Sequence, residues 1–354
     1  MKLPSHGSNP HYLYKSLGLE MPENYTDFSA NINPLGPPPA MQEEWKHSFR
    51  YIQDYPDPQA SVLTKKIAAM EGVPEKSVLL GNGGAEIISL VARWLAGKRV
   101  MIIHPAFSEY ETACLANGCE ITRHVLQEGV WELDFPPLDG INAVFLCTPN
   151  NPTGTEYSRQ AVLHLLQECK ERGVFVIIDE AFYDFLEEAA TYAAHLHHYP
   201  HLIILRSLTK MYSIPGLRLG YLLAAPEIAG RIAAYRPHWS VNALALMAGE
   251  ICINAEEHVK RTRELIKAER LKLKDYYDSS GFIMSKSSVN FYLLKDSNDT
   301  DASGLLRFLL ENGIVPRHTL NFPGLTGRWL RFAVKTARDN CSLMEVLQRW
   351  RKKE

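Results

Sequence analysis

Two apolar runs with polar ends, VFVIIDEAF at 174–182 and HLIILRSLTK at 201–210, decide how this chain folds. Each run is a continuous stretch of mostly Val, Ile and Leu without polar alternation. Such stretches are typical of strands that are buried on both faces of a parallel sheet. Asp179 follows the apolar part of the first run, and Lys210 closes the second. Because ligands bind beyond the carboxyl ends of strands in an open parallel sheet, these polar ends predict a functional site.

The flanking sequence alternates between helical and strand-like segments. Apolar residues at helical spacing, closed by glycine in several cases, predict helices, and short apolar runs between them predict strands. The predicted helices are 61–72, 85–97 and 158–173, with an amphipathic stretch at 107–117, and the predicted strands are 77–80, 99–105, 142–149, 174–179 and 201–207. Regular alternation of this kind predicts an α/β fold with a mostly parallel sheet. Polar or glycine-rich segments follow four of the strands, which suggests that they share one site.

The character of the sequence changes near residue 242. A long charged helix, a strand, a shorter helix, a second strand and a last helix follow, which predicts a smaller α+β domain. We therefore expect an N-terminal arm at 1–44 associated with the small domain, a large domain at 45–240 and a small C-terminal domain at 241–354. The Pro-rich stretch NPLGPPPA at 33–40 predicts an extended linker after the arm.

Composition narrows the class of protein. The chain has 354 residues, 46% of them hydrophobic and 22% charged, with a formal net charge of −2. This is ordinary globular composition, and it gives no sign of a nucleic-acid or membrane partner. The six scattered cysteines form no CxxC pair, and the N-terminal MKLPSHGSNP has no apolar signal region. These features predict reduced thiols and a cytoplasmic protein.

The segment SLTKMYSIPGLRLGY at 207–221 carries the strongest chemical signal. A lysine just after a buried strand can be desolvated, which lowers the pKa of its amine and makes it a nucleophile. Ser207, Thr209 and Arg218 supply hydroxyl and cationic groups suited to a phosphate. The alternative for Lys210 is an ordinary surface lysine on a loop. The spacing of Ser207, Lys210 and Arg218 resembles the lysine signature of the class I/II aminotransferase family.

That resemblance implies a fold-type I enzyme with pyridoxal 5′-phosphate (PLP) carried on Lys210. A buried carboxylate needs a cationic partner, and the resemblance pairs Asp179 with the protonated pyridine nitrogen. Asn151, in TPNNPTG, would donate to the 3′-oxygen of PLP. Gly84 and Ala85, in GNGGAE at a helix start, would hold the phosphate through free backbone N–H groups. Taken separately, Asp179 could instead cap a helix, and NPTG is only a turn signal.

Two aromatic residues extend the same resemblance. Phe107, in HPAFSEY, matches the family's ring that stacks on the pyridine, although an aromatic residue there could equally be part of the core. Tyr55, in DYPDP, matches a tyrosine that reaches the phosphate of the neighbouring subunit's cofactor. This implies an obligate homodimer with a shared active site.

Segments in the arm and tail indicate the reaction. HGSN at 6–9, DFSANINPLG at 27–36 and the segment from Ile314 to Val334 resemble the branch of the family that decarboxylates O-phospho-L-threonine in cobalamin biosynthesis. The substrate-binding residues implied by this resemblance are His6, Gly7, Asn31, Asn151, Arg317 and Arg331. Arg331 would hold the carboxylate, and Arg317 with His6 and the Gly7 backbone would hold the phosphate. Phe182 stands where the related histidinol-phosphate aminotransferases have a tyrosine, whereas Ser8 replaces a glycine of the decarboxylases.

Other readings remain open. The chain could be an aminotransferase that acts on histidinol phosphate or another phosphorylated amine, or a protein of this fold kept for binding without catalysis. The histidines in HLHHYPH at 195–201 fit no zinc spacing, and PLP chemistry needs no metal, so we expect none. The basic run from Arg261 to Lys274 alternates with acids, which favours a solvated helix face over a nucleic-acid patch.

Overall fold

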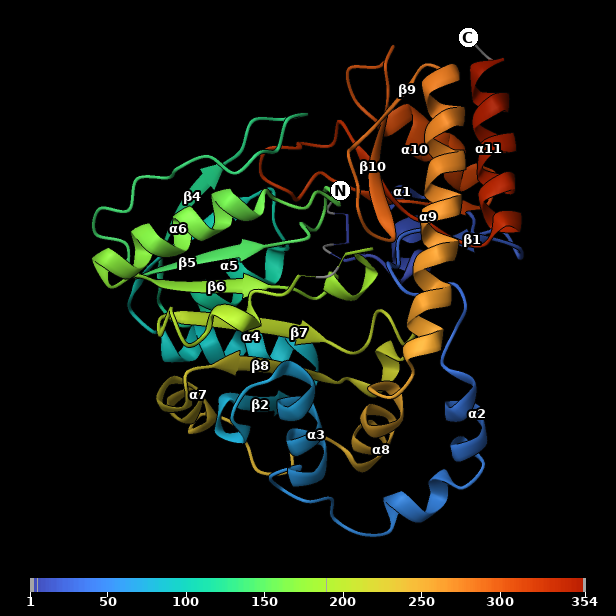
Figure 1. Cartoon of the computed structure of the whole chain (residues 1–354). Helices are drawn as coiled ribbons and strands as arrows, with labels where there is room; N and C mark the ends of the chain where they lie inside the picture. Colours follow the sequence, from blue (N-terminus) through green and yellow to red (C-terminus); the bar gives the residue numbers. More distant parts are fainter. Residues whose placement is uncertain (1–2, 5, 189, 353–354) are drawn as a thin grey trace.

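The computed structural model describes residues 3–4, 6–188 and 190–352. Within these ranges the chain builds a seven-stranded sheet, a four-stranded sheet and a two-stranded pair, with helices around them (Figure 1). The strands of the large sheet are β2 (Val78–Gly81), β3 (Arg99–His104), β4 (Glu120–Val125), β5 (Ala143–Cys147), β6 (Phe175–Asp179), β7 (Leu202–Ser207) and β8 (Gly220–Ala224). The predicted α/β fold is confirmed.

The large sheet has the order β2-β8-β7-β6-β5-β3-β4. β8 runs antiparallel to both of its neighbours, and the other neighbouring pairs are parallel. Because β8 is antiparallel to both β2 and β7, β2 runs in the same direction as β7, and therefore in the same direction as β5 and β6. The polar segments after these four strands therefore meet at one edge of the sheet, as the sequence predicted. The antiparallel β8 was not predicted.

Helices cover both faces of the large sheet, because its strands are apolar on both sides. α4 (Gly83–Trp94), α5 (Ser108–Ala116) and α7 (Pro226–Ala233) pack in one apolar cluster on one face. α3 (Ser61–Glu71), α6 (Arg159–Arg172) and α8 (Ala243–Cys252) belong to the cluster on the other face. α3 and α6 end at Gly72 and Gly173, both with φ of 66°, a left-handed conformation that glycine adopts without steric cost.

The tail forms the small sheet, in the order β12-β13-β10-β9. Its strands are β9 (Phe282–Met284), β10 (Phe291–Asp296), β12 (Arg317–His318) and β13 (Leu330–Ala333). The long helix α9 (Glu256–Ser279) packs against α11 (Ala337–Arg351), which in turn packs against α10 (Ser303–Glu311) (Figure 1). These elements agree with the predicted α+β tail. The domain boundaries themselves remain predictions.

The N-terminal arm lies against the tail. β1 (Thr26–Asp27) pairs in parallel with β11 (Ile314–Val315), and the hydroxyl of Tyr14 in α1 (Pro10–Leu17) donates to the carbonyl oxygen of Leu310 at 2.7 Å. The predicted linker at 33–40 needs a correction, because α2 (Pro39–Trp45) already begins inside it. Proline is favoured in the first helical turn, where its missing N–H is not needed.

All six cysteines are free, and only Cys341 is exposed, as expected for reduced thiols. In the part of the chain that is described, no helix has both the length and the apolar character to cross a membrane.

Candidate active site

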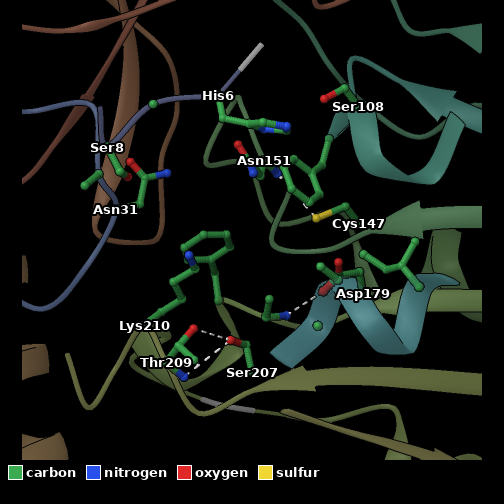
Figure 2. Close-up of a pocket in the computed structure, with 18 of the residues that line it drawn as sticks. His6, Ser8, Asn31, Ser108, Cys147, Asn151, Asp179, Ser207, Thr209 and Lys210 are labelled. Carbon is green, nitrogen blue, oxygen red and sulfur yellow. Dashed lines mark hydrogen bonds between the residues drawn. The ribbon is translucent and has the colours of Figure 1, made fainter. Parts of the chain in front are cut away.

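A pocket of about 240 Å³ opens at the carboxyl edge of the large sheet, where the arm and the small sheet also meet it (Figure 2). Every predicted site residue except Tyr55 lines it. These residues are His6, Gly7, Asn31, Gly84, Ala85, Phe107, Asn151, Asp179, Ser207, Thr209, Lys210, Arg218, Arg317 and Arg331. The structure therefore brings together segments that are more than three hundred residues apart in the chain.

Lys210 follows β7 and reaches up into the pocket (Figure 2). Burial, together with the positive charges of Arg331 and Arg218, lowers the pKa of its amine from 10.5 to about 8, although the charge of Asp179 opposes the shift. A substantial fraction of this amine is therefore neutral near physiological pH. Only the neutral amine can attack a carbonyl carbon, so Lys210 has the chemistry of a carbonyl-binding nucleophile rather than of a surface lysine.

Asp179 ends β6 on the floor of the pocket. Oδ2 accepts a hydrogen bond from the hydroxyl of Tyr110 at 2.6 Å, and Oδ1 accepts one from the backbone N–H of Ala181 at 2.9 Å. Desolvation raises the pKa of the carboxyl group, and both hydrogen bonds together with the charge of Lys210 oppose that rise. A carboxylate in this setting is ready to pair with a cation in the pocket.

The start of α4 forms an anion cradle. Gly83 has φ of 78°, and a Cβ atom there would lie 2.5 Å from Nη2 of Arg218, so only glycine lets the guanidinium approach. Asn82 occupies the N-cap position of α4, but its side chain accepts no hydrogen bond from the first turn of the helix. The first backbone N–H groups of α4 are therefore available to a ligand. The hydroxyls of Ser207 and Thr209 are hydrogen-bonded to one another at 2.8 Å in the same pocket. Together these groups suit a phosphate.

These residues fit the PLP that the sequence predicts. The pocket offers a desolvated amine, a buried carboxylate for the pyridine nitrogen and a cradle for a phosphate. Phe107 precedes α5 at the pocket wall, where an aromatic ring could cover the pyridine. In the described structure, no group of three His, Cys, Asp or Glu side chains is placed to hold a metal ion.

Arg331 lies on β13 and is buried next to Asn151. Its Nη1 donates to Oδ1 of Asn151 at 2.5 Å and its Nη2 to the carbonyl oxygen of Ser29 at 2.9 Å. Its Nε is buried and has no hydrogen-bond acceptor among the described residues. The side-chain oxygen Oδ1 of Asn31 is also buried and has no hydrogen-bond donor among them. Burial, with the charge of Arg317, lowers the pKa of the guanidinium to about 9, and Asp27 opposes the shift. The bond to Asn151 uses the amide oxygen, so the amide N–H₂ group of Asn151 remains able to donate.

Arg317 and the arm form the other wall. The Arg317 guanidinium donates to the carbonyl oxygen of His318 at 2.7 Å and to Oδ1 of Asn321 at 2.6 Å, and burial lowers its pKa to about 10. His6 Nε2 lies 3.0 Å from Oε1 of Glu109 in α5, and its ring meets Phe107 edge-on at 5.9 Å. The arm therefore contacts the start of α5 and contributes to the lining of the pocket.

The turn after His6 depends on tight backbone packing. A Cβ atom on Gly7 would lie 2.7 Å from the carbonyl oxygen of Ser29, so Gly7 allows this close approach. Ser8 has φ of 68°, and its N–H donates to the hydroxyl of Ser29 at 2.8 Å. The left-handed backbone explains why a glycine at this position suits the turn, and the bond to Ser29 helps to hold the serine there.

Tyr55 is the predicted site residue that lies outside the pocket. It is 85% exposed and packs against Trp239 with a ring separation of 5.2 Å. Trp45, Phe49 and Ile52 are exposed nearby in the sequence. Within one chain, then, Tyr55 makes no contribution to the pocket, and its role in a partner's site remains a prediction.

The structure adds residues that the sequence did not reveal. Tyr110, Cys147, Ser29, Ser108 and Phe322 also line the pocket. Tyr110 could have been suspected, because it follows Phe107 by about one helical turn and would share its face of α5. Phe182 is buried in the pocket wall and meets Phe291 edge-on at 4.7 Å, so this position offers no hydroxyl to a ligand.

Comparisons with known proteins agree with this geometry. Residues 23–349 match the family model described as aminotransferase class I and II. The chain is 36% identical to threonine-phosphate decarboxylase of Salmonella typhimurium, over 97% of this chain and 96% of that protein.

Two solved structures share the architecture. Histidinol-phosphate aminotransferase from Clostridium acetobutylicum has a TM-score of 0.86 at 29% identity, and L-threonine-O-3-phosphate decarboxylase from Porphyromonas gingivalis has a TM-score of 0.82 at 25% identity. Each covers 92% of this chain and 99% of its own. The shared fold therefore extends over most of the chain.

Proposed function

The chain belongs to the aminotransferase class I and II family, and from this premise we propose that it is a PLP enzyme that decarboxylates O-phospho-L-threonine. The products are CO₂ and (R)-1-aminopropan-2-yl phosphate, a compound that serves cobalamin biosynthesis. PLP would be held by Lys210, Asp179, Asn151, Phe107 and the cradle at the start of α4, all of which line the pocket. When bound, it supplies an electron sink for the pair that is left on Cα as CO₂ departs.

The observation that carries the proposal is the environment of Arg331. This guanidinium is buried beside Lys210, its hydrogen bonds go to neutral oxygens, and its Nε has no acceptor among the described residues. A buried cation is costly unless an anion pairs with it. A substrate carboxylate would supply that anion, since the planar fork of an arginine binds a carboxylate through two parallel hydrogen bonds.

A second anion-binding region supports a phosphorylated substrate. Arg317 is buried in the same pocket, and His6 and Gly7 of the N-terminal arm line this pocket as well. Arginine, imidazole and backbone N–H groups are the usual partners of a phosphate. O-phospho-L-threonine carries a carboxylate and a phosphate, so it can satisfy both regions at once.

The chain's own residues would direct the reaction. Arg331 and Asn31 orient the carboxylate, while Arg317 and His6 hold the phosphate, so that the bond from Cα to the carboxylate is placed for cleavage. A proton replaces the lost carboxylate at Cα. Lys210, whose pKa is about 8, can both accept and return a proton near neutral pH, and water is the other possible donor.

A histidinol-phosphate aminotransferase is the second candidate, because the chain shares its architecture with one from Clostridium acetobutylicum. Phe182 favours the decarboxylase, since the aminotransferases usually place a tyrosine hydroxyl toward the cofactor at this position. A protein kept only for binding is disfavoured, because Lys210, Asp179, Asn151 and Arg218 all line the same pocket.

We also propose that the enzyme works as a cytoplasmic homodimer with shared sites. Tyr55 is exposed and would donate to the phosphate of the cofactor in the partner subunit. The contact of Tyr55 with Trp239, which is also exposed, supports this, because exposed aromatic side chains that pack together are typical of a protein interface.

Product analysis tests the reaction. Purified enzyme with PLP is incubated with O-phospho-L-threonine, with and without 2-oxoglutarate, and CO₂ and the amine phosphate are measured. Equal amounts of both products without any requirement for 2-oxoglutarate support the proposal, and a Lys210→Ala variant serves as the inactive control. Acceptor-dependent turnover of histidinol phosphate, with no CO₂ from phosphothreonine, would assign the chain to the aminotransferases.

A further inference from the structure

Tyr110 is a buried tyrosine at the floor of the pocket to which the roles above assign nothing. It is 1% exposed, and its hydroxyl donates to Oδ2 of Asp179 at 2.6 Å. In Figure 2, Asp179 lies on the right-hand side of the pocket, opposite Ser8 and Asn31. The two residues are 69 positions apart, so only the fold brings them together.

The ring of Tyr110 is held in place by its neighbours. It stacks on Phe145 of β5, with ring centres 5.3 Å apart and an angle of 21°, and it meets Phe107 edge-on at 5.9 Å. Phe107 and Tyr110 lie about one turn apart at the start of α5. The same turn of helix therefore presents the ring expected to cover the pyridine and the hydroxyl that contacts the carboxylate.

The direction of the hydrogen bond follows from the ionisation of its partners. Burial and the negative charge of Asp179 keep the pKa of Tyr110 well above 10, so the phenol is neutral and donates. Hydrogen bonds that end on a carboxylate stabilise its charged form. In the described structure, Asp179 has Tyr110 on Oδ2 and the N–H of Ala181 on Oδ1, which also restricts rotation of the carboxylate.

We propose that Tyr110 is a positioning residue that holds Asp179 as an oriented carboxylate for the pyridine nitrogen of PLP. The inference rests on the assignment of PLP, and it does not depend on which substrate the enzyme uses. A buried carboxylate that lost this donor would be less readily ionised and freer to rotate, and its grip on the protonated ring would weaken.

The first test is the affinity of the apoprotein for PLP. Tyr110→Phe removes only the hydroxyl and keeps the ring that packs on Phe145. A hydrogen bond to a charged group is worth about 1.5–3 kcal/mol, so we expect the Kd for PLP to rise by about 10- to 100-fold. Tyr157→Phe is the matched control, because Tyr157 is also buried but its hydroxyl has no partner among the described residues.

A double-mutant cycle separates this role from a general loss of packing. In an Asp179→Ala background, Tyr110→Phe should change the Kd by less than about threefold, since the acceptor of the hydrogen bond is already absent. The absorbance of bound PLP is also measured as a function of pH. The midpoint pH of this titration should shift in Tyr110→Phe but not in Tyr157→Phe. An equal loss of affinity in both backgrounds, or an unchanged midpoint, would overturn the inference.

These measurements need no substrate. If the unmutated enzyme binds PLP but transaminates, the proposed decarboxylase activity is wrong. The inference about Tyr110 is then still decided by the double-mutant cycle. If the unmutated protein does not bind PLP, both are overturned.

Discussion

Arg331 donates a hydrogen bond of 2.5 Å to the amide oxygen of Asn151, and this bond joins the small sheet to the loop after β5 of the large sheet. The residue expected to bind the substrate carboxylate is thereby in direct contact with a residue expected to bind the cofactor. A substrate carboxylate on Arg331 and a cofactor on Asn151 would therefore be positioned relative to one another through this contact.

Replacing Arg331 should impair catalysis as well as binding. Because Arg331 both orients the carboxylate and contacts Asn151, we expect Arg331→Ala to lower kcat/KM by at least about 100-fold, with a fall in kcat itself. Loss of orientation at Cα should also produce some keto-acid-dependent transamination. Steady-state kinetics with product analysis would test this. Arg328→Ala, an exposed arginine that pairs with Glu128, is the control and should behave like the unmutated enzyme.

Arg317→Ala should mainly weaken binding of the substrate's phosphate group. We expect KM for O-phospho-L-threonine to rise by about 10- to 100-fold, since a charge-assisted hydrogen bond is lost. Free threonine lacks the phosphate and should be a poor substrate for both proteins. Comparing kcat/KM for the two substrates in the variant and the unmutated enzyme measures this preference. An equal loss for both substrates would place Arg317 outside the phosphate site.

Lys210 should destabilise the protein in the absence of PLP. Its pKa falls from 10.5 to about 8, so the folded state binds this proton less well than the unfolded state does. At about 1.4 kcal/mol per pKa unit, the charged amine costs about 3 kcal/mol below pH 8, and the cost disappears as the pH rises from 8 to above 10.5.

Lys210→Met should therefore unfold at higher denaturant concentration than the unmutated apoprotein at pH 7. Methionine has a similar length and no charge, so the difference isolates the amine. The advantage should shrink as the pH is raised toward 10.5, whereas Lys65→Met, at an exposed position on α3, should show no such trend. Denaturant unfolding at several pH values measures both, and a pH-independent difference would contradict the prediction.

Tyr55→Phe should weaken retention of PLP by about one to two orders of magnitude, because one hydrogen bond to a charged phosphate is lost. The assembly should remain a dimer, since the ring is kept. Equilibrium dialysis of PLP and light scattering would measure the two properties. Tyr25→Phe, at another exposed tyrosine, is the control. An unmutated protein that is a fully active monomer would show that the site is not shared.

The sequence alone determined the elements and the most reactive residues of this protein. Apolar periodicity and glycine stops located α3, α6 and the strands β5 to β7, because these signals act within a few residues of the chain. The spacing within 207–221 was enough to single out Lys210 and Arg218. The polar ends of parallel strands then predicted that Asp179, Asn151 and Gly84 would meet Lys210, and they do.

Only the tertiary structure decided which groups touch one another. Three contacts join segments from 69 to 180 residues apart: the bond from Tyr110 to Asp179, the bond from Arg331 to Asn151 and the contact of His6 with Glu109. The antiparallel insertion of β8 between β2 and β7 was also undetected. Contacts of this kind depend on how whole sheets and helices pack, and no local pattern encodes that packing, because many distant side chains must bury their apolar surfaces together before any of these pairs can form.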